Sequence, residues 1–346
     1  MAIIDKPSDY FNSVLWTGTG SSNAISGIGF SPDFIWGKGR TNADSWFMVD
    51  SFRGATKHLR SDSTDSEYTR AQDVKTIDSD GFTVGTDDLV NKNTTTFVSY
   101  NWLADTSFSN DASSTGIGTI DSTGSANTDS GFSIVSWTGT QSAGTIKHGL
   151  STPPRLILVR ARTQDDGWYV WHIDYDASNN KYQRLEIAGG LGAGTHFWND
   201  TAPTSSVFSV GTSTGTNHSS AMLAYCFADV PHYQKIGKYI GNGNANGTFV
   251  YTGFKPSFVF FKRFDTGKDG IIHNNKTFPS NQAVAKILKP NSNAVEADTG
   301  NIDILSNGFK LLSNGSNSNT SGGSYIYYAI AENPFVTSTG VPTTAR

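Results

Sequence analysis

The sequence predicts an all-β protein made of three tandem antiparallel β-sandwich units of jelly-roll or similar strand order, and three observations lead to this fold class. One phrase of turn and strand residues occurs three times along the 346 residues. Short apolar and aromatic runs are separated by polar, turn-forming tracts at the spacing expected of a sandwich. Glycine is abundant, with 36 copies, and charged residues make up only 16% of the chain; this composition disfavours helices.

The repeated phrase joins a turn to a buried strand. It consists of a Gly-aromatic or Gly-Leu pair, a proline, and a short apolar run that ends in a cation. It occupies residues 29–38, 149–160 and 253–262. Glycine and proline turn the chain, and the apolar run that follows them predicts a strand.

Further strands surround each copy of the phrase in a constant order. A strand that ends in an aromatic residue and a glycine precedes it, and two more strands follow it. They are expected at 14–18, 134–139 and 236–241, at 45–49, 167–171 and 270–273, and at 81–85, 207–211 and 308–312.

One segment is ambiguous when it is read alone. Residues 282–289 would pass for a short helix, but their counterparts at 56–60 and 181–187 have the composition of strands. We therefore predict a strand at 282–289 as well.

Each unit closes on a strand whose large side chains alternate with smaller ones. The large set is Val98, Tyr100 and Trp102, then Leu223, Tyr225 and Phe227, then Ile326, Tyr328 and Ile330. The intervening set is Ser99 and Asn101, then Ala224 and Cys226, and less cleanly Tyr327 and Ala329. A period of two places the sets on opposite faces of a strand, so the large face is predicted to be core. A strand layer, a domain or a partner can approach the small face closely.

The spacing of equivalent residues predicts the domain boundaries. Trp16 and Trp137 are farther apart in sequence than Trp137 and Tyr239, and the excess falls in a Ser/Thr/Gly/Asp tract at 106–130. We therefore predict sandwich units at 1–105, 131–230 and 231–346, an interdomain linker at 106–130, and a tail after Phe335.

Charge, cysteine content and hydropathy exclude several classes of protein. The net charge of -4 is small, and no basic run is long enough to follow a phosphate backbone, so nucleic acid is not an expected partner. A single cysteine, Cys226, cannot form an intrachain disulfide. No signal peptide and no membrane-spanning apolar stretch is apparent, so we expect a soluble product made in the cytoplasm.

Groups that could carry chemistry are present, but they do not converge. His172 and Asp174 alternate with Ile173 and fit a polar strand edge better than a metal or acid-base site. The acids at 78–81 and 121–129 fit hairpin turns, because the bidentate acid of a calcium loop is missing. The glycines at 189–194 fit a flexible loop, because no helix and no Lys-Ser/Thr follows. We therefore assign no catalytic, cofactor-binding or metal-binding residue, and we predict that the protein is not an enzyme.

Aromatic residues are the remaining signal, at 12% of the chain. Exposed aromatic rings beside Asn, Asp and Gln commonly bind sugars, but most of the rings here occupy repeated strand positions that favour core packing. Trp198 has no tryptophan counterpart in the other units. It is the aromatic residue that the sequence favours for a surface site.

With its units aligned, the chain resembles a family of repeat-built structural proteins of tailed bacteriophages, notably those of marine and freshwater bacteria and cyanobacteria. The residues at 28–33, 50–57, 197–208 and 250–256 carry the likeness, which extends from about Phe11 to Phe335. The string Asp-Ser-Phe-Arg-Gly-Ala-Thr-Lys at 50–57 is its most specific part. The resemblance implies a virion component and supplies no catalytic residues.

Three functions follow as alternatives. The first is a tail-fibre or receptor-binding protein, the second a capsid decoration or head-fibre protein, and the third a polysaccharide depolymerase, for which no facing pair of acids is discernible. The expected partners are further copies of the chain in a symmetric homo-oligomer, with a trimer favoured, other virion proteins, and a glycan or receptor on the host surface. The expected location is the virion, after synthesis in the host cytoplasm, and no cofactor is expected.

Overall fold

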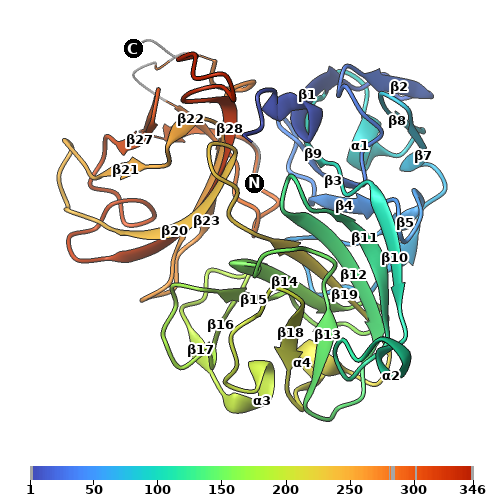
Figure 1. The fold of residues 1–346 in the computed structure, drawn as a ribbon. Helices are drawn as coiled ribbons and strands as arrows, with labels where there is room; N and C mark the ends of the chain where they lie inside the picture. The colour runs from blue at the N-terminus through green and yellow to red at the C-terminus, as the bar shows by residue number, and fades with distance from the viewer. Residues whose placement is uncertain (1–2, 280, 282–284, 301, 344–346) are drawn as a thin grey trace.

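The computed structural model describes residues 3–279, 281, 285–300 and 302–343, which form three β-rich lobes around a common centre (Figure 1). We call the described residues up to 105 the first lobe, those from 106 to 230 the second lobe, and those from 231 onward the third lobe. The sheets are antiparallel, and each helix is a single turn, so the all-β prediction is confirmed. No helix in the described ranges is long and apolar enough to cross a membrane.

Each lobe contains a set of four strands in one spatial order, which we call its inner sheet. In the first lobe the order is β1 (Phe11–Thr17), β9 (Thr96–Trp102), β3 (Phe34–Gly39) and β4 (Phe47–Asp50). The equivalent strands are β12 (Phe132–Thr138), β19 (Ala221–Phe227), β14 (Leu156–Ala161) and β15 (Tyr169–His172) in the second lobe, and β20 (Gln234–Ile240), β28 (Ser324–Pro334), β22 (Phe254–Arg263) and β23 (Gly270–Asn274) in the third.

The repeated phrase supplies the third strand of each inner sheet. The glycines that open it, Gly29, Gly149 and Gly253, have φ angles of 94°, 79° and 85°. Glycine is favoured at such angles because it has no Cβ to clash. The repeated turn thus has a backbone requirement that explains its composition.

A smaller outer layer covers each inner sheet and encloses a lobe core, as expected of a sandwich. It consists of β2 (Asn23–Ser26), β8 (Gly81–Val84) and β7 (Val74–Asp78) in the first lobe, β13 (Gly144–Lys147) and β18 (Val207–Val210) in the second, and β21 (Phe249–Tyr251), β27 (Gly308–Leu311) and β26 (Ile302–Leu305) in the third. Shorter elements are η1 (Pro7–Asp9), β5 (Lys57–His58), β6 (Tyr68–Thr69), α1 (Asp88–Asn91), α3 (Thr195–Trp198), α4 (Thr214–Asn217), β24 (Ala285–Ile287) and β25 (Ala297–Gly300).

The strand predicted at 282–289 falls partly within the described residues. β24 covers its second half, whereas residues 282–284 lie outside the described ranges.

The prediction of a linker at 106–130 is wrong. β10 (Thr106–Asn110), α2 (Ala112–Thr115) and β11 (Ser122–Asn127) form an extension of the second lobe, in which β11 pairs with β12. With β16 (Lys181–Arg184) and β17 (Gly192–Ala193) at the other edge, the sheet has eight strands. Backbone hydrogen bonds hold this tract without large apolar side chains, and buried small residues such as Gly124 and Ala126 allow close packing.

The large side chains of the closing strands β9, β19 and β28 meet in a central core that all three lobes share. The rings of Phe34 and Tyr225 stack at 4.1 Å between centroids, and Phe227 and Tyr328 lie 5.0 Å apart. Trp102 donates from Nε1 to the Tyr328 hydroxyl at 3.0 Å. The void between these described residues is only about 20 Å³, too small for a ligand, so this part of the core is closely packed.

The small side chains of the closing strands face the lobe cores. Ala224 and Cys226 belong to the core of the second lobe, and Tyr327 and Ala329 to that of the third. The prediction that the large face is buried is therefore confirmed, but the large face is shared between lobes and the small face is buried within each lobe.

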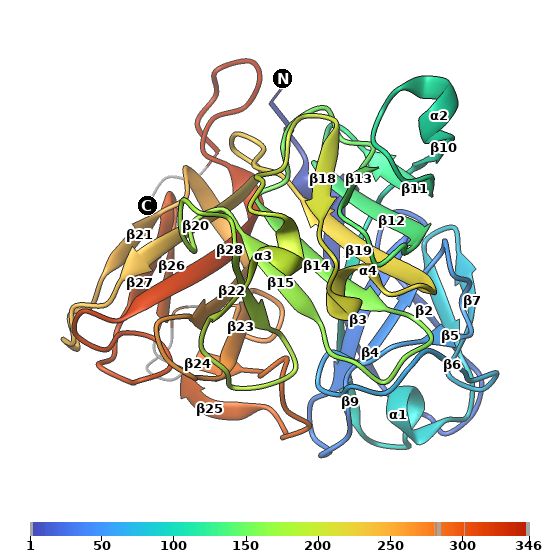
Figure 2. The same cartoon turned by 90° about the horizontal axis from the view of Figure 1, so that it is seen from below.

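The cation that ends each repeated phrase reaches into a neighbouring lobe. Lys38 donates to the backbone oxygen of Asn293 at 2.9 Å, Arg160 to that of Ser63 at 2.9 Å, and Lys262 to that of Ile187 at 2.6 Å. The first lobe thus binds the third, the second binds the first, and the third binds the second. The same contact therefore closes a ring of lobes within one chain. Figure 2 shows the three lobes from a second direction.

Backbone hydrogen bonds repeat around the same ring. The amide nitrogens of Glu296, Glu67 and Leu191 donate to the oxygens of Arg40, Arg162 and Phe264 at 2.8, 2.6 and 3.1 Å. Bidentate ion pairs accompany the first two contacts, Arg40 with Glu296 and Arg162 with Glu67. The third boundary has the apolar residues Leu191 and Phe264 instead.

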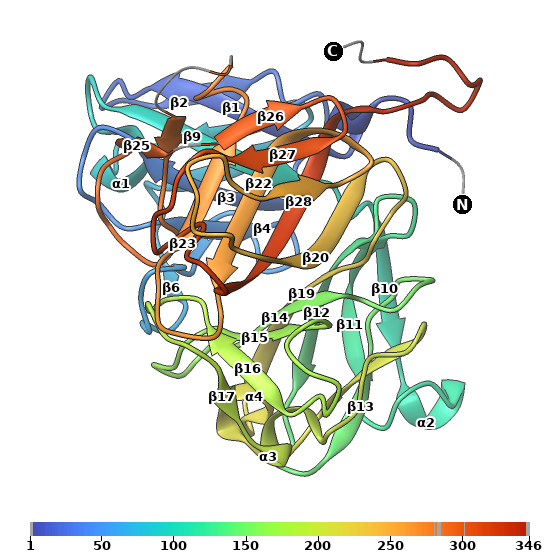
Figure 3. The ribbon, with the colours of Figure 1, turned by 90° about the vertical axis from the view of Figure 1, so that its left-hand side faces the viewer.

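The first and last described segments of the chain come together at Asp5 and Ser338, near the ends of the ribbon in Figure 3. Ser338 donates from its backbone nitrogen to Asp5 Oδ1 at 2.6 Å and from its hydroxyl to Asp5 Oδ2 at 2.5 Å. The segment after Phe335, which the sequence predicts to be a tail, is thus tied to the N-terminal segment at Ser338.

Candidate functional site

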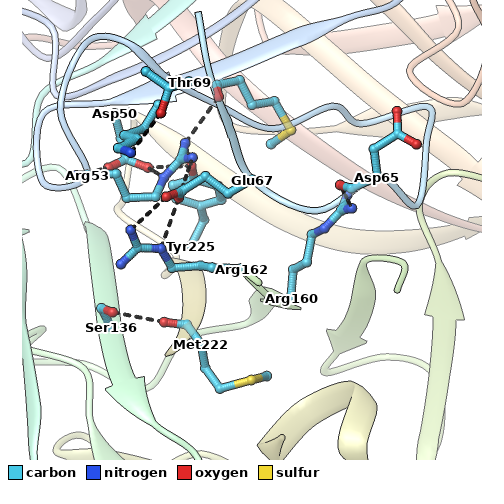
Figure 4. A network of polar contacts seen from close by, with 12 residues as sticks. Asp50, Arg53, Asp65, Glu67, Thr69, Ser136, Arg160, Arg162, Met222 and Tyr225 are labelled. Carbon is cyan, nitrogen blue, oxygen red and sulfur yellow. Dashed lines mark hydrogen bonds and ion pairs between the residues drawn. The ribbon is translucent and has the colours of Figure 1, made fainter. Parts of the chain in front are cut away.

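A network of buried polar side chains lies between the first and second lobes (Figure 4). Arg53 donates from Nε to Asp50 Oδ2 at 2.5 Å and from Nη1 to Glu67 Oε2 at 3.2 Å. The hydroxyl of Tyr225, from the second lobe, donates to Asp50 Oδ2 at 2.7 Å. Arg162 binds Glu67 through two hydrogen bonds of 2.9 Å. We call these residues the interlobe ion network.

The centre of the interlobe ion network is structural, because a substrate cannot reach it. The side chains of Asp50 and Arg53 have no exposed surface, and Tyr225 is fully buried. Burial opposes the charge on Arg53, but Asp50 and Glu67 raise its pKa above the ordinary value. Burial likewise opposes the charge on Glu67, and hydrogen bonds from Arg162 hold its pKa below the ordinary value. Every charge is paired, as a buried ion must be.

The network explains the most specific string of the sequence. Asp50 and Arg53 are the first and fourth residues of the segment 50–57, and Gly54 has a φ of 98°, which favours glycine. The string therefore supplies two of the residues that connect the first lobe to the second.

The pair His172 and Asp174 forms no metal or acid-base site. His172 is 2% exposed, and burial lowers its pKa to about 3, so the imidazole is neutral at ordinary pH. Its Nδ1 accepts a hydrogen bond from the Asp174 backbone nitrogen at 3.1 Å, while the Asp174 carboxylate lies 3.6 Å from Arg155. Within the described residues no three His, Cys, Asp or Glu side chains lie close enough together to hold a metal ion.

The acids and glycines that fitted turns and loops have structural contacts. Asp80 accepts hydrogen bonds from the backbone nitrogens of Gly27 at 3.1 Å and Gly29 at 2.6 Å, which hold the first repeated turn. The loop at 189–194 contributes the Leu191 contact to the third lobe. Both are explained by the fold.

Two residues that stood out in the sequence are buried. Trp198 is 1% exposed and packs in the core of the second lobe, so its selection as a surface aromatic residue is wrong. It lies on α3, and its neighbour Phe197 packs 4.0 Å from the ring of Tyr182. Cys226 is fully buried, and burial raises the pKa of its thiol, so it is not a nucleophile.

A second carboxylate–imidazole pair is closed to solvent as well. His58 Nδ1 lies 2.6 Å from Asp73 Oδ2, and both side chains are 1% exposed. The ring of Tyr68 stacks over His58 at 5.0 Å. A general acid or base must touch its substrate, and this pair cannot.

An open site lies on the second lobe, where the extension meets β12. It is a cleft of about 670 Å³, within the range of ligand-binding sites. Its lining includes Asp111 and Asp121 from the extension, and Trp137 and Thr138 from β12. The first and third lobes have no counterpart of β10 and α2 among their described residues. The cleft is therefore a feature that distinguishes the second lobe from the other two.

Trp137, which lines part of this cleft, also has a buried donor that differs from its counterparts. Its counterpart Trp16 donates from Nε1 to the Val90 oxygen at 3.0 Å, and the counterpart Tyr239 donates to the Ser318 oxygen at 2.8 Å. Trp137 is 4% exposed, and its Nε1 has no partner in the part of the chain that the structure describes. The hydrogen bonding of this repeated position therefore differs in the second lobe.

The acids of the cleft suit binding better than acid catalysis. Asp111 caps α2, and hydrogen bonds from Ser113 and Ser114 lower its pKa, whereas a general acid needs a raised one. Asp121 Oδ1 accepts from the Ala112 nitrogen at 2.8 Å. Both carboxylates therefore shape the cleft.

Comparison with known families places the whole lobed body in one group. A family profile described as Domain of unknown function (DUF7483) matches residues 6–334, which cover all three lobes. The chain belongs to this family. The description of the DUF7483 family states no activity, and no curated protein matches the chain. The phage resemblance therefore stays a prediction.

Three buried asparagines were missed in the sequence. Asn91, Asn217 and Asn319 are fully buried at equivalent places, and each side-chain oxygen accepts from the backbone of the loop after the first inner strand, at 2.9, 3.0 and 2.9 Å. Each amide nitrogen donates to a backbone oxygen near the outer layer. An Asn at the same place in three aligned units is the signal that would have found them.

Proposed function

We propose that the protein is a structural component of a tailed-bacteriophage particle and acts as a tail-fibre or receptor-binding adhesion protein, without catalysing a reaction. The observation that carries the proposal is the cleft of the second lobe. It is wide and open, it is built by an extension specific to that lobe, and its lining combines the acids Asp111 and Asp121 with the aromatic residue Trp137. These features suit capture of a polar ligand.

Two further points support an adhesive role. The resemblance of the segments 28–33 and 50–57 is to phage structural proteins. The buried charges of the interlobe ion network are paired with one another, and Arg162 and Tyr225 link them to the second lobe, which favours a rigid body that presents a surface. A symmetric homo-oligomer, with a trimer favoured, remains part of the proposal and would be read from the mass in solution by light scattering.

Capsid decoration or a head-fibre role is the second candidate, and the three-lobed ring favours it. A body with three similar sides can sit over a three-fold position of a protein shell as a single chain.

Immunogold labelling and mass spectrometry of purified particles test these candidates. Label at the tail supports adhesion, label over the head supports decoration, and absence from the particles refutes both.

Competition for host adsorption tests the cleft itself. We expect the purified protein to reduce adsorption of phage to host cells, and Thr138→Trp, which fills the cleft, to abolish that effect. Thr17→Trp is the matched control, because Thr17 ends β1 as Thr138 ends β12, and both are exposed. Equal competition by both variants would refute the assignment of the cleft.

A further inference from the structure

The outer sheet of the third lobe carries two exposed aromatic rings on one face. Phe249 is 44% exposed and Tyr251 is 63% exposed, while Val250 between them is 5% exposed and packs in the lobe core. The side chains of Phe249 and Tyr251 point to the same side, because they are two residues apart on β21. They lie roughly 7 Å apart along the strand.

The other two lobes have small or polar residues at the same places. In the third lobe Phe249 pairs with Lys310 across the outer sheet. The equivalent pairs are Ala24 with Thr83 in the first lobe and Thr145 with Ser209 in the second. Tyr251 likewise corresponds to Ser26 and Lys147. The fold therefore does not require aromatic residues here, and their exposure opposes solubility without stabilising the core.

Hydrogen-bonding groups border the two rings. Lys310, the cross-strand neighbour of Phe249, donates from Nζ to Asn246 Oδ1. Asn244 and Asn246 are exposed, and their Nδ2 groups donate to nothing within the described residues. Asp303 lies opposite Lys310 on β26, so the charges on this face balance.

We propose that this face, formed by Phe249, Tyr251, Asn246 and Lys310, binds a neutral oligosaccharide or polysaccharide chain. The flat rings offer stacking surfaces for the apolar faces of sugar rings, and the amide and ammonium donors match sugar hydroxyls. The balanced charge gives an acidic polymer no advantage.

The size of the face favours a sugar over a second copy of the chain. With about 200 Å² for a fully exposed aromatic side chain, the two rings offer roughly 200 Å² together. A stable protein–protein interface needs about 800 Å² from each partner. The exposed surface of the two rings is large enough to contact a short saccharide. This inference names a ligand class for the adhesion role proposed above, but it concerns a different lobe and a different surface.

Calorimetric titration with neutral hexasaccharides tests the inference, with oligomers of glucose, mannose, galactose and N-acetylglucosamine as the probes. We expect wild-type protein to bind at least one of them, and the double variant Phe249→Ala with Tyr251→Ala to bind it about tenfold more weakly or not at all. The matched control is Thr145→Ala with Lys147→Ala on the second lobe, which is expected to bind as wild type does. Unchanged melting temperatures would show that both double variants are folded.

Three outcomes overturn the inference. They are absence of binding to all four oligomers, unchanged binding by the aromatic double variant, and sedimentation showing that wild-type protein self-associates through these rings while the variant is monomeric. The test is separate from that of the proposed function, because a protein absent from phage particles can still bind the sugar, and a virion protein can fail to do so.

Discussion

Replacing Arg53 with methionine is expected to destabilise the protein by about 3–5 kcal/mol, the range for breaking a buried ion pair by removing one partner. The Arg53 side chain has no exposed surface and donates to Asp50, Glu67, the Met48 oxygen at 3.1 Å and the Tyr225 hydroxyl at 3.3 Å. Without it, the buried carboxylate of Asp50 keeps only neutral donors, the Tyr225 hydroxyl and the backbone nitrogen of residue 53.

Urea unfolding followed by tryptophan fluorescence measures the loss, which corresponds to a fall in melting temperature of roughly 5–10 °C. Adding Asp50→Asn to the variant removes the buried negative charge that Arg53 no longer neutralises. The double variant should therefore recover part of the stability. Lys6→Met is the control, because Lys6 and Asp9 form an exposed pair with 71% and 50% of their side-chain surfaces accessible, and it should leave the midpoint unchanged. If Arg53→Met unfolded at the wild-type urea concentration, the network would not join the lobes.

Three more predictions follow from the fold. Unfolding should be a single cooperative transition, with equal calorimetric and van't Hoff enthalpies, because the lobes share one core; three separate transitions would contradict this. Asn217→Ala should cost about 3 kcal/mol or more in unfolding free energy, because it strands buried backbone groups, whereas the exposed Asn93→Ala should cost little; equal midpoints for the two would refute the role of Asn217. Burial lowers the pKa of His148 to about 4 and of His172 and His273 to about 3, so the unfolded chain binds more protons and the melting temperature should fall as pH drops from about 6.5 to 4. A melting temperature that stayed level over this range would show that these imidazoles are charged in the fold.

Patterns of period two and repeated turns made the β architecture predictable. The alternation around Tyr100, Tyr225 and Tyr328 identified the buried face, because a strand has a fixed side-chain period. The turn glycines marked where the inner strands begin. These are local properties, so one sequence displays them directly.

Contacts between lobes were not predictable in the same way. The repeated cations Lys38, Arg160 and Lys262 were visible as the ends of apolar runs, but their partners are backbone oxygens, which leave no trace in side-chain composition. The extension at 106–130 was mistaken for a linker for a related reason, since backbone pairing can hold a polar strand. Trp198 was misplaced because a residue without a counterpart in the repeat can still fill a lobe core.

The candidate surfaces lay beyond prediction from composition, because exposure depends on the whole fold. Phe249 and Tyr251 read as ordinary strand aromatics until the register places them opposite Lys310 and Gly308 on the outer face. Trp137 occupies the same repeated position as Trp16, and only the hydrogen-bond partners distinguish the two.

The closed ring also changes how the molecule can respond to dilution and to mutation. A trimer of separate lobes would come apart as its concentration fell, whereas lobes joined covalently meet at an effective concentration that the solution cannot alter. In such a trimer every substitution would appear three times around the axis. In this chain each lobe is encoded once, so one lobe carries a cleft and another an aromatic face while the contacts of Lys38, Arg160 and Lys262 stay in place.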